Sequence, residues 1–144
     1  MMSERYHIKQ LSIFAENRPG RLASVAKAIK EEGINIYAFS IAEGAGYGVI
    51  RMLVDQTEKA FSKLHGLGYT VRYTDVLALE MEDRPGGLYD AITILGEAGI
   101  NIEYSYAYSG RKCAVLIIRV EDIDVTIEKL LASGTRLLEM SQFT

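Results

Sequence analysis

The sequence contains one short motif twice, at a spacing that divides the chain into two similar halves. The segment Glu16-Asn17-Arg18-Pro19-Gly20-Arg21-Leu22 recurs 66 positions later as Glu82-Asp83-Arg84-Pro85-Gly86-Gly87-Leu88. At the same offset, Gly33-Ile34-Asn35-Ile36 recurs as Gly99-Ile100-Asn101-Ile102. A repeat that holds one register without gaps indicates a duplicated structural unit, so we expect two domains, residues 1–74 and 75–144.

The residues around each motif predict a strand followed by a helix. Apolar side chains alternate before the motif, at 11–15 and 77–81, which is the period of a β-strand. After the motif they recur every three or four residues, which places them on one face of a helix. We expect the prolines in the first helical turn, where a missing N–H is no loss, and a glycine just past the helix end. The helical positions are Leu22, Val25, Ala26 and Ile29 in the first half and Leu88, Ala91, Ile92 and Leu95 in the second.

The rest of each half predicts two more strands, a second helix and a last strand. β-Branched and aromatic residues are frequent at 34–42 and 47–54, and again at 100–108 and 113–120, which favours strands joined by glycine-containing turns. We expect Asp55 to cap the second helix of the first half, and last strands at 69–73 and 136–140. The order β-α-β-β-α-β predicts an α+β fold of two ferredoxin-like units, each an antiparallel four-stranded sheet with its helices on one face.

Composition and charge exclude several classes of function. The chain has 144 residues, a formal net charge of −3 and one cysteine. A negative net charge argues against binding through many phosphates, so we expect no nucleic-acid partner. No segment has the roughly 20 apolar residues that span a bilayer, and the N-terminus lacks the apolar core of a signal peptide. We therefore expect a cytoplasmic protein with no membrane partner.

The sequence has no pattern typical of a catalytic or metal site. His7 and His65 have no counterparts in the other half, and their spacing is not that of a metal site. Cys113 occupies an apolar strand position, which favours a small core residue over a nucleophile. The alternate tyrosines of 104–108 share one strand face, where packing is favoured over base stacking because a basic surface is missing. We expect no enzyme activity, no cofactor and no metal.

The central strands are apolar on both faces. Residues 37–41 and 114–118 are apolar or aromatic at nearly every position, although a sheet with helices on one face leaves its other face open. Packing between the two halves of one chain would cover these faces. A homodimer through the open faces would also cover them, and we favour it because edge-to-edge pairing of the halves leaves the faces exposed.

The repeated motif lies where a predicted strand meets the start of a helix. Backbone N–H groups there have no partner within the helix, and with the helix dipole they form a site for a carboxylate or phosphate. Gly20 and Gly86 let a ligand approach the backbone. Asn17 offers both a donor and an acceptor, so an α-amino acid would suit this corner. The same residues also suit a turn that only caps the helix, and the motif by itself leaves both interpretations open.

A strand, then Asn-Arg-Pro-Gly-x-Leu, then a helix that ends in Gly-Ile-Asn-Ile resembles the ACT domain, and the resemblance covers nearly the whole chain, twice. It implies domains paired side by side, amino-acid binding and regulation of metabolic enzymes. It also implies ligand sites between the first loop of one domain and the second strand of its neighbour. One site would contain Asn17, Pro19, Gly20, Arg21, Leu22, Asn101 and Ile102, and the other would contain Asp83, Pro85, Gly86, Gly87, Leu88, Asn35 and Ile36.

The second copy departs from the family pattern, because Asp83 stands where the first copy has Asn17. A carboxylate there would repel the carboxylate of a ligand and favour its ammonium group. The two sites therefore need not be equivalent.

These patterns favour a stand-alone, non-catalytic regulatory protein that binds an amino acid at the seam between its two ACT-like domains. A ligand at the seam would act by binding one arrangement of the domains more tightly than another. The alternative is a regulatory subunit that docks onto a separate amino-acid biosynthetic enzyme. A third hypothesis is a small enzyme on a ferredoxin-like frame.

Overall fold

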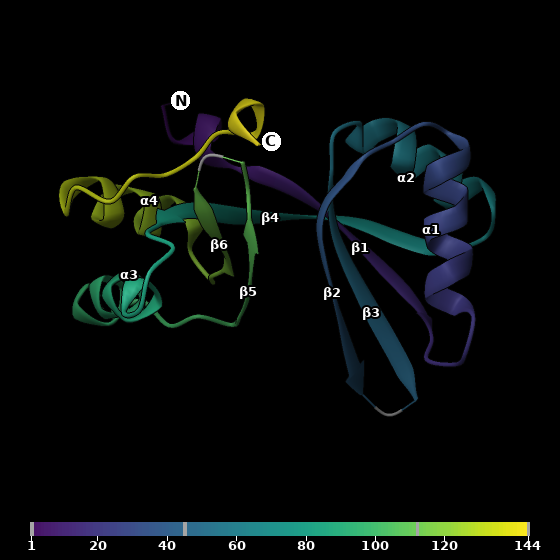
Figure 1. The fold of residues 1–144 in the computed structure, drawn as a ribbon, viewed down its shortest axis with the longest axis horizontal. Coiled ribbons are helices and arrows are strands. Elements are labelled where there is room, and N and C mark those ends of the chain that lie inside the picture. The colour runs from purple at the N-terminus through teal and green to yellow at the C-terminus, as the bar shows by residue number, and fades with distance from the viewer. Residues whose placement is uncertain (1, 45, 112, 144) are drawn as a thin grey trace. The chain divides into compact units, whose positions relative to one another are not determined.

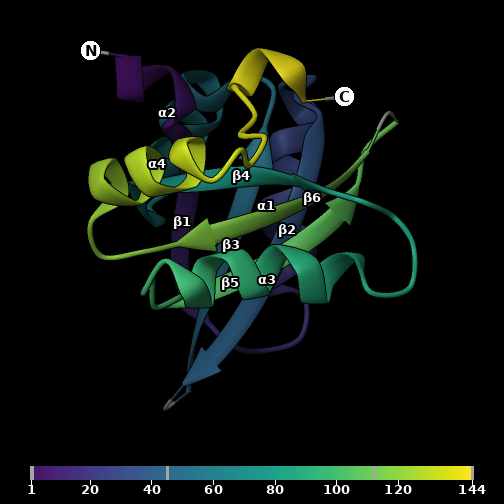
Figure 2. The same cartoon turned by 90° about the vertical axis from the view of Figure 1, so that its left-hand side faces the viewer.

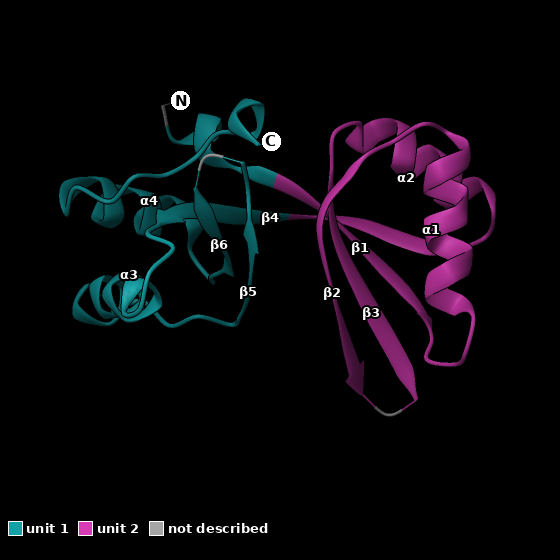
Figure 3. Cartoon of the chain, in the orientation of Figure 1, with its two compact units in different colours: residues 1–8, 75–144 teal, residues 9–74 magenta. Residues whose placement is uncertain are grey.

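The computed structural model describes residues 2–44, 46–111 and 113–143, and Figure 1 and Figure 2 show the chain from two directions. The chain forms two compact units, residues 9–74 and residues 1–8 with 75–144 (Figure 3). Both contain helices packed on antiparallel strands, so the predicted α+β fold is confirmed.

The unit of residues 9–74 has the predicted order of elements. These are β1 (Ile8–Glu16), α1 (Arg21–Glu31), β2 (Ile36–Gly44), β3 (Tyr47–Val54), α2 (Thr57–Gly66) and the first part of β4 (Thr70–Met81). The strands lie in the order β2-β3-β1-β4. β3 is antiparallel to both neighbours, with Met52 opposite Leu11 on one side and Phe39 on the other.

The apolar core of this unit lies between the sheet and its two helices. Leu11 and Ile13 on β1, Val25 and Ile29 on α1 and Leu64 on α2 are at most 1% exposed. Side chains two apart on a strand and four apart on a helix face the same way, so the periodicity of the sequence determines which face each element buries. Each such side chain contributes about 1.5–3 kcal/mol of burial free energy.

The unit of residues 1–8 and 75–144 repeats this plan with shorter strands. β4 is followed by α3 (Gly87–Glu97), β5 (Tyr104–Ser109), β6 (Ala114–Arg119) and α4 (Ile123–Ala132). The strand order is β4-β6-β5, with β6 antiparallel to both neighbours. Figure 2 shows α3 and α4 on the same side of these strands. Leu77, Leu95, Ile118 and Leu130 are fully buried in the core.

The prediction of a last strand at 136–140 is wrong. Leu137 makes only an isolated bridge to Leu79. Met140–Gln142 form a short 3₁₀ helix that opens with a capping box from Glu139. This tight helix ends the extended segment before a full ladder can form beside β4.

The first helix of each unit begins later than predicted. α1 begins at Arg21 and α3 at Gly87, each after an N-cap glycine, so Pro19 and Pro85 do not lie in the first helical turn. The N–H of the first helical residue donates instead to the carbonyl three residues earlier. Each proline therefore lies inside a tight turn, where its fixed φ is favourable.

The predicted cap of α2 is also wrong. The N-cap residue is Gln56, which makes no capping hydrogen bond with its side chain. Asp55 Oδ1 accepts instead from the N–H of Asn35, at 3.0 Å. At the corresponding place in the other unit, Asp122 caps α4 by accepting from the N–H of Val125. A displacement of one residue along the chain therefore moves the carboxylate from the helix N-terminus to the residue that precedes β2.

The residues before β1 pack with the unit that contains 75–144. Met2–Tyr6 form a 3₁₀ helix, η1, and Tyr6 packs against the core of that unit. His7 lies between two carboxylates, with Nε2 2.9 Å from Asp124 Oδ1 and Nδ1 3.4 Å from Asp75 Oδ2. This imidazole joins the N-terminal segment to two distant parts of the unit.

Opposing effects act on the pKa of His7. Burial, the largest effect, lowers the pKa, but hydrogen bonds and negative charge from Asp124 and Asp75 outweigh it and the pKa is raised. The hydrogen bond from His7 lowers the pKa of Asp124. A raised histidine pKa stabilises the fold fully below the ordinary value of 6.5, and this stabilisation is lost as the pH rises through the raised value. The lowered pKa of Asp124 stabilises the fold above pH 3.8, its ordinary pKa, and this stabilisation is lost as the pH falls through the lowered pKa.

We therefore expect His7→Gln to lower the Tm most between about pH 4 and pH 6.5, by roughly 2 °C, and to have little effect near pH 8.5. Thermal unfolding followed by circular dichroism at several pH values measures this difference. Adding Asp124→Asn to His7→Gln should lower the Tm little further, because the two residues share one interaction. An equal loss at all pH values would contradict a role for the charged pair.

Candidate functional site

The loop between β1 and α1 borders a hollow of about 490 Å³ in the unit of residues 9–74. This volume is in the range typical of small-molecule sites, about 300–1,000 Å³. The lining consists of the end of β1, the whole loop, the first turn of α1 and three residues of β2 and β3. These residues are Ala15, Glu16, Asn17, Arg18, Pro19, Gly20, Arg21, Leu22, Ile41, Gly48 and Ile50.

The backbone at Gly20 leaves hydrogen-bond donors facing away from the helix. Its φ is 89°, in the left-handed region that favours glycine. Gly20 is the N-cap of α1 and provides no capping side chain. Within the described part of the chain, the N–H groups of Leu22 and Ala23 have no acceptor. With the positive end of the helix dipole, they are suited to bind an anionic group.

Polar side chains of both signs surround these donors. Glu16 and Arg18 form an exposed ion pair with 3.5 Å between Oε2 and Nη1. Asn17 is exposed, and its backbone N–H donates to the carbonyl of Gly46 at 3.2 Å. The corner therefore offers donors for a carboxylate, and carboxylate and amide oxygens for an ammonium group.

Gly48 on β3 opens the apolar wall of the hollow. A Cβ at this position would lie 3.6 Å from the carbonyl oxygen of Ala15 and 3.7 Å from Cβ of Asn17, which are ordinary van der Waals distances. The backbone therefore does not require glycine here, and the missing side chain leaves space beside Ile41 and Ile50. Sequence reasoning missed these three residues, although a glycine inside a predicted strand is a signal of close approach or free space.

Five residues predicted for the first site lie together around this hollow: Asn17, Pro19, Gly20, Arg21 and Leu22. Asn35 and Ile36 are in the same unit but outside the lining. The carbonyl of Asn35 accepts from the N–H of Asp55 at 3.1 Å, and Ile36 packs against the core.

The corresponding loop of the other unit is held by Arg84. This guanidinium donates to the carboxylate of Glu82 and, through Nη2, to Asp90 Oδ2 at 2.9 Å. The hydrogen bond to Glu82 raises the pKa of Arg84. A nearby hollow of about 220 Å³ includes Gly87 in its lining. The other predicted residues of this loop are exposed: Asp83, Pro85, Gly86 and Leu88.

Gly87 is where this second loop packs most closely on its helix. A Cβ added there would lie 1.9 Å from the carbonyl oxygen of Glu82, so the backbone admits no larger residue without moving. Arg21 occupies the corresponding position in the first copy. The repeated motif therefore has two different local structures.

Asn101 and Ile102 also belong to the unit with 75–144. Asn101 lines a hollow of about 230 Å³ together with Asp122 and Lys129, while Ile102 packs against the core. The predicted pairing of these residues with Asn17 stays a prediction, because they belong to different units.

The described residues include no group of three or more His, Cys, Asp and Glu side chains that could hold a metal ion. Burial raises the pKa of the Cys113 thiol, which disfavours the reactive thiolate. Among the helices of the described chain, none is both long and apolar enough to cross a membrane.

Comparison with known proteins identifies a family. The family model described as "ACT domain pair" matches residues 6–142. The crystal structure of protein BT0572 from Bacteroides thetaiotaomicron is 36% identical, with a TM-score of 0.87 and 94% of each chain covered. Curated proteins gave no significant match.

More distant structures share the fold. The ligand-free regulatory subunit of aspartate kinase from Thermus thermophilus is 16% identical, with a TM-score of 0.65, 89% of this chain covered and 91% of that one. The corresponding subunit from Thermus flavus is 15% identical, with a TM-score of 0.56, 88% of this chain covered and 92% of that one.

We expect Gly87→Ala to destabilise the protein by about 1–3 kcal/mol, because the new methyl group overlaps the Glu82 carbonyl. Gly96→Ala is a matched control within α3, since a Cβ there meets no atom within 4 Å. The control should stabilise the helix by about 0.5–1 kcal/mol. Urea unfolding of both variants measures the two changes, and equal stabilities would contradict the close packing at Gly87.

Proposed function

Because the chain belongs to the ACT domain pair family, we propose that it is a cytoplasmic, non-catalytic regulatory protein that binds a free amino acid. The observation that supports this most is the hollow of about 490 Å³ at the start of α1. Among the described residues its backbone donors at Leu22 and Ala23 have no acceptor. Its polar side chains carry both signs of charge, and its far wall is apolar.

Each part of an amino acid has a matching group in this hollow. The ligand carboxylate accepts from the N–H groups of Leu22 and Ala23, at the positive end of the α1 dipole. The ammonium group donates to the Asn17 amide oxygen and to Glu16. The ligand side chain lies toward Ile41, where the missing side chain of Gly48 leaves room.

We propose that each site is completed by the Gly-Ile-Asn-Ile motif of the other repeat in the same chain. Asn101 and Ile102 would close the site at 17–22, and Asn35 and Ile36 would close the site at 83–88. The support for this pairing is the repeated motifs and the family to which the chain belongs. We expect the site at 17–22 to bind the ligand more tightly, because Arg84 in the other loop is already bonded to Glu82 and Asp90.

Regulation then follows from a difference in affinity. A ligand that contacts both units favours the arrangement to which it binds more tightly. Coupling free energies of about 1–3 kcal/mol are typical of such control. An enzyme or other protein that recognises one arrangement would sense the ligand.

Thermal unfolding in the presence of each of the twenty amino acids tests the proposal. One ligand or a few should raise the Tm, because a ligand that binds only the folded protein stabilises it by mass action. Asn17→Ala and Gly48→Val should each abolish the rise, the first by removing a polar contact and the second by filling the hollow. Asp83→Ala, the matched change in the other loop, should leave most of the ligand-induced rise in Tm.

A flat response across the whole panel would contradict amino-acid binding. It would favour a regulatory subunit that docks onto a separate biosynthetic enzyme. In that case the protein should co-purify with a larger catalytic chain from its native source.

We also propose that the protein is a homodimer, and that the contact is made through the edge strand β2 rather than through the open sheet faces expected from the sequence. This strand is at the end of the strand order, and its side chains Phe39 and Ile41 are 53% and 47% exposed on one face. An unpaired strand edge with exposed apolar side chains is a surface onto which the strand of a second chain can pair.

We expect the wild-type protein to have the mass of a dimer by light scattering, and Phe39→Ser to have the mass of a monomer. Tyr89→Ser is a control, because Tyr89 on α3 is even more exposed, at 72%, but is not on β2. A monomeric wild-type protein would contradict the proposal.

A further inference from the structure

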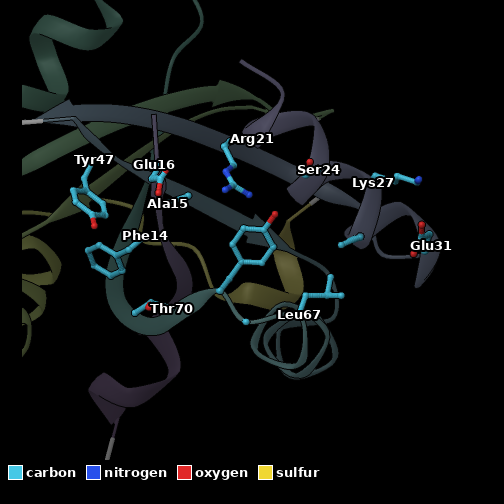
Figure 4. Close-up of a pocket in the computed structure, with 13 residues that line it drawn as sticks. Phe14, Ala15, Glu16, Arg21, Ser24, Lys27, Glu31, Tyr47, Leu67 and Thr70 are labelled. Atoms are coloured by element: carbon cyan, nitrogen blue, oxygen red, sulfur yellow. The ribbon is translucent and has the colours of Figure 1, made fainter. Parts of the chain in front are cut away.

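A second hollow, of about 530 Å³, lies beside the first in the unit of residues 9–74. It is bordered by the end of β1, one side of α1, Tyr47 on β3 and the segment that follows α2 (Figure 4). Arg21, Ser24 and Lys27 line it from α1, and Leu67 lines it from the segment after α2.

The guanidinium of Arg21 is directed into this hollow (Figure 4). Its Nε is buried and has no hydrogen-bond partner within the described part of the chain. A buried N–H without an acceptor is unfavourable, so a rotation of this side chain that brings Nε to an acceptor in the hollow would be favoured. The planar edge of a guanidinium matches the two oxygens of a carboxylate.

The two cations and the two carboxylates that line the hollow differ in whether they are paired. Its two carboxylates have cationic partners, because Glu16 pairs with Arg18 at 3.5 Å and Glu31 pairs at 3.4 Å with Lys63, which Glu32 shares at 3.5 Å. Arg21 and Lys27 have no ion pair within the described residues. The site therefore attracts an anion, with Arg21 inside the hollow and Lys27 along its edge.

The remaining wall is apolar and partly aromatic. Phe14, Leu67 and Tyr47 line the hollow with 37%, 56% and 63% of their surfaces exposed. Aromatic side chains favour contact with a flat ring, stacked or edge on. A ligand that combines an anionic group with a planar apolar body would use both walls.

The equivalent place in the other unit lacks these features. The hollow there is about 220 Å³, with Gly87 in place of Arg21 and Asp90 in place of Ser24. Its cation, Arg136, is already paired with Glu80 at 2.8 Å. The other unit therefore has a hollow at the equivalent position, but without the unpaired arginine.

We propose that the hollow at Arg21 is a second ligand site, which binds a small carboxylic acid that carries a planar apolar ring. Arg21 receives the carboxylate, and Phe14, Tyr47 and Leu67 contact the ring. An ammonium group next to the carboxylate would meet unpaired cations, so this site disfavours amino acids. Its lining shares Ala15, Glu16 and Arg21 with that of the proposed amino-acid site. The two sites bind the ligand carboxylate through different groups, the Arg21 guanidinium here and the N–H groups of Leu22 and Ala23 there, so each can be tested by itself.

Isothermal titration of the full chain with 3-phenylpropionate tests the proposal, with 3-phenylpropan-1-ol as the uncharged probe of similar shape. We expect saturable binding of the acid at millimolar concentration and at least about tenfold weaker binding of the alcohol. Arg21→Gln should weaken binding of the acid by about tenfold or more. Lys30→Gln, which removes an exposed cation of α1 outside the hollow, should leave it unchanged.

Two substitutions of opposite charge at the exposed residue Leu67 distinguish an electrostatic effect on binding from a loss of folding. Leu67→Glu should weaken binding of 3-phenylpropionate, whereas Leu67→Lys should retain or strengthen it. Circular dichroism of both variants confirms that they fold. Asn17→Ala, on the neighbouring hollow, distinguishes the two sites and should leave binding of this acid intact.

Four results would overturn the proposal. The first is equal binding of the acid and the alcohol, and the second is unchanged binding in Arg21→Gln. The third is loss of binding in Asn17→Ala without any effect of Leu67→Glu, which would place the acid in the first hollow. Tighter binding of inorganic phosphate than of the acid would overturn the ligand class.

Discussion

The structure depends on a glycine in the left-handed conformation between the first strand and first helix of each unit. Gly20 has a φ of 89° and Gly86 a φ of 88°, a conformation that residues with a side chain rarely adopt. The turn starts each helix without a capping side chain. The unpaired donors, the position of Arg21 and both hollows around α1 follow from this one backbone geometry.

The sequence predicted most of the elements and much of the core because these depend on local periodicity, although Leu88 and Ile92 of the predicted stripe on α3 are 50% and 42% exposed. Leu11 and Ile13 are two apart on a strand, Val25 and Ile29 are four apart on a helix, and all four are buried. It also predicted the loop residues of the site, which are contiguous. Gly48 and other strand residues of the hollow were missed because their nearness to the loop depends on strand pairing, which no local pattern encodes. The last strand failed for the same reason, since the segment after α4 depends on what packs beside it.

The two copies show how a duplicated frame can diverge in chemistry while keeping its fold. Both helices begin in the same way, but the residue after the glycine is Arg21 in one and Gly87 in the other. Removing a side chain there lets the loop carbonyl of Glu82 move against the helix. Arg84 then pairs with two carboxylates of the same unit, Glu82 and Asp90, whereas its counterpart Arg18 pairs with Glu16.

The continuous strand β4 has a consequence for the evolution of the protein. It runs unbroken from Thr70 to Met81, across the boundary between residues 74 and 75 that separates the compact units. Residues 1–8 belong to the unit formed by the other end of the chain. A gene fragment for either repeat would therefore cut through a strand, and the later repeat would lose Tyr6 from its core. The boundaries of the sequence repeat and of the compact units therefore differ, so neither repeat can be cut out at residue 74 without removing part of a strand or of a core.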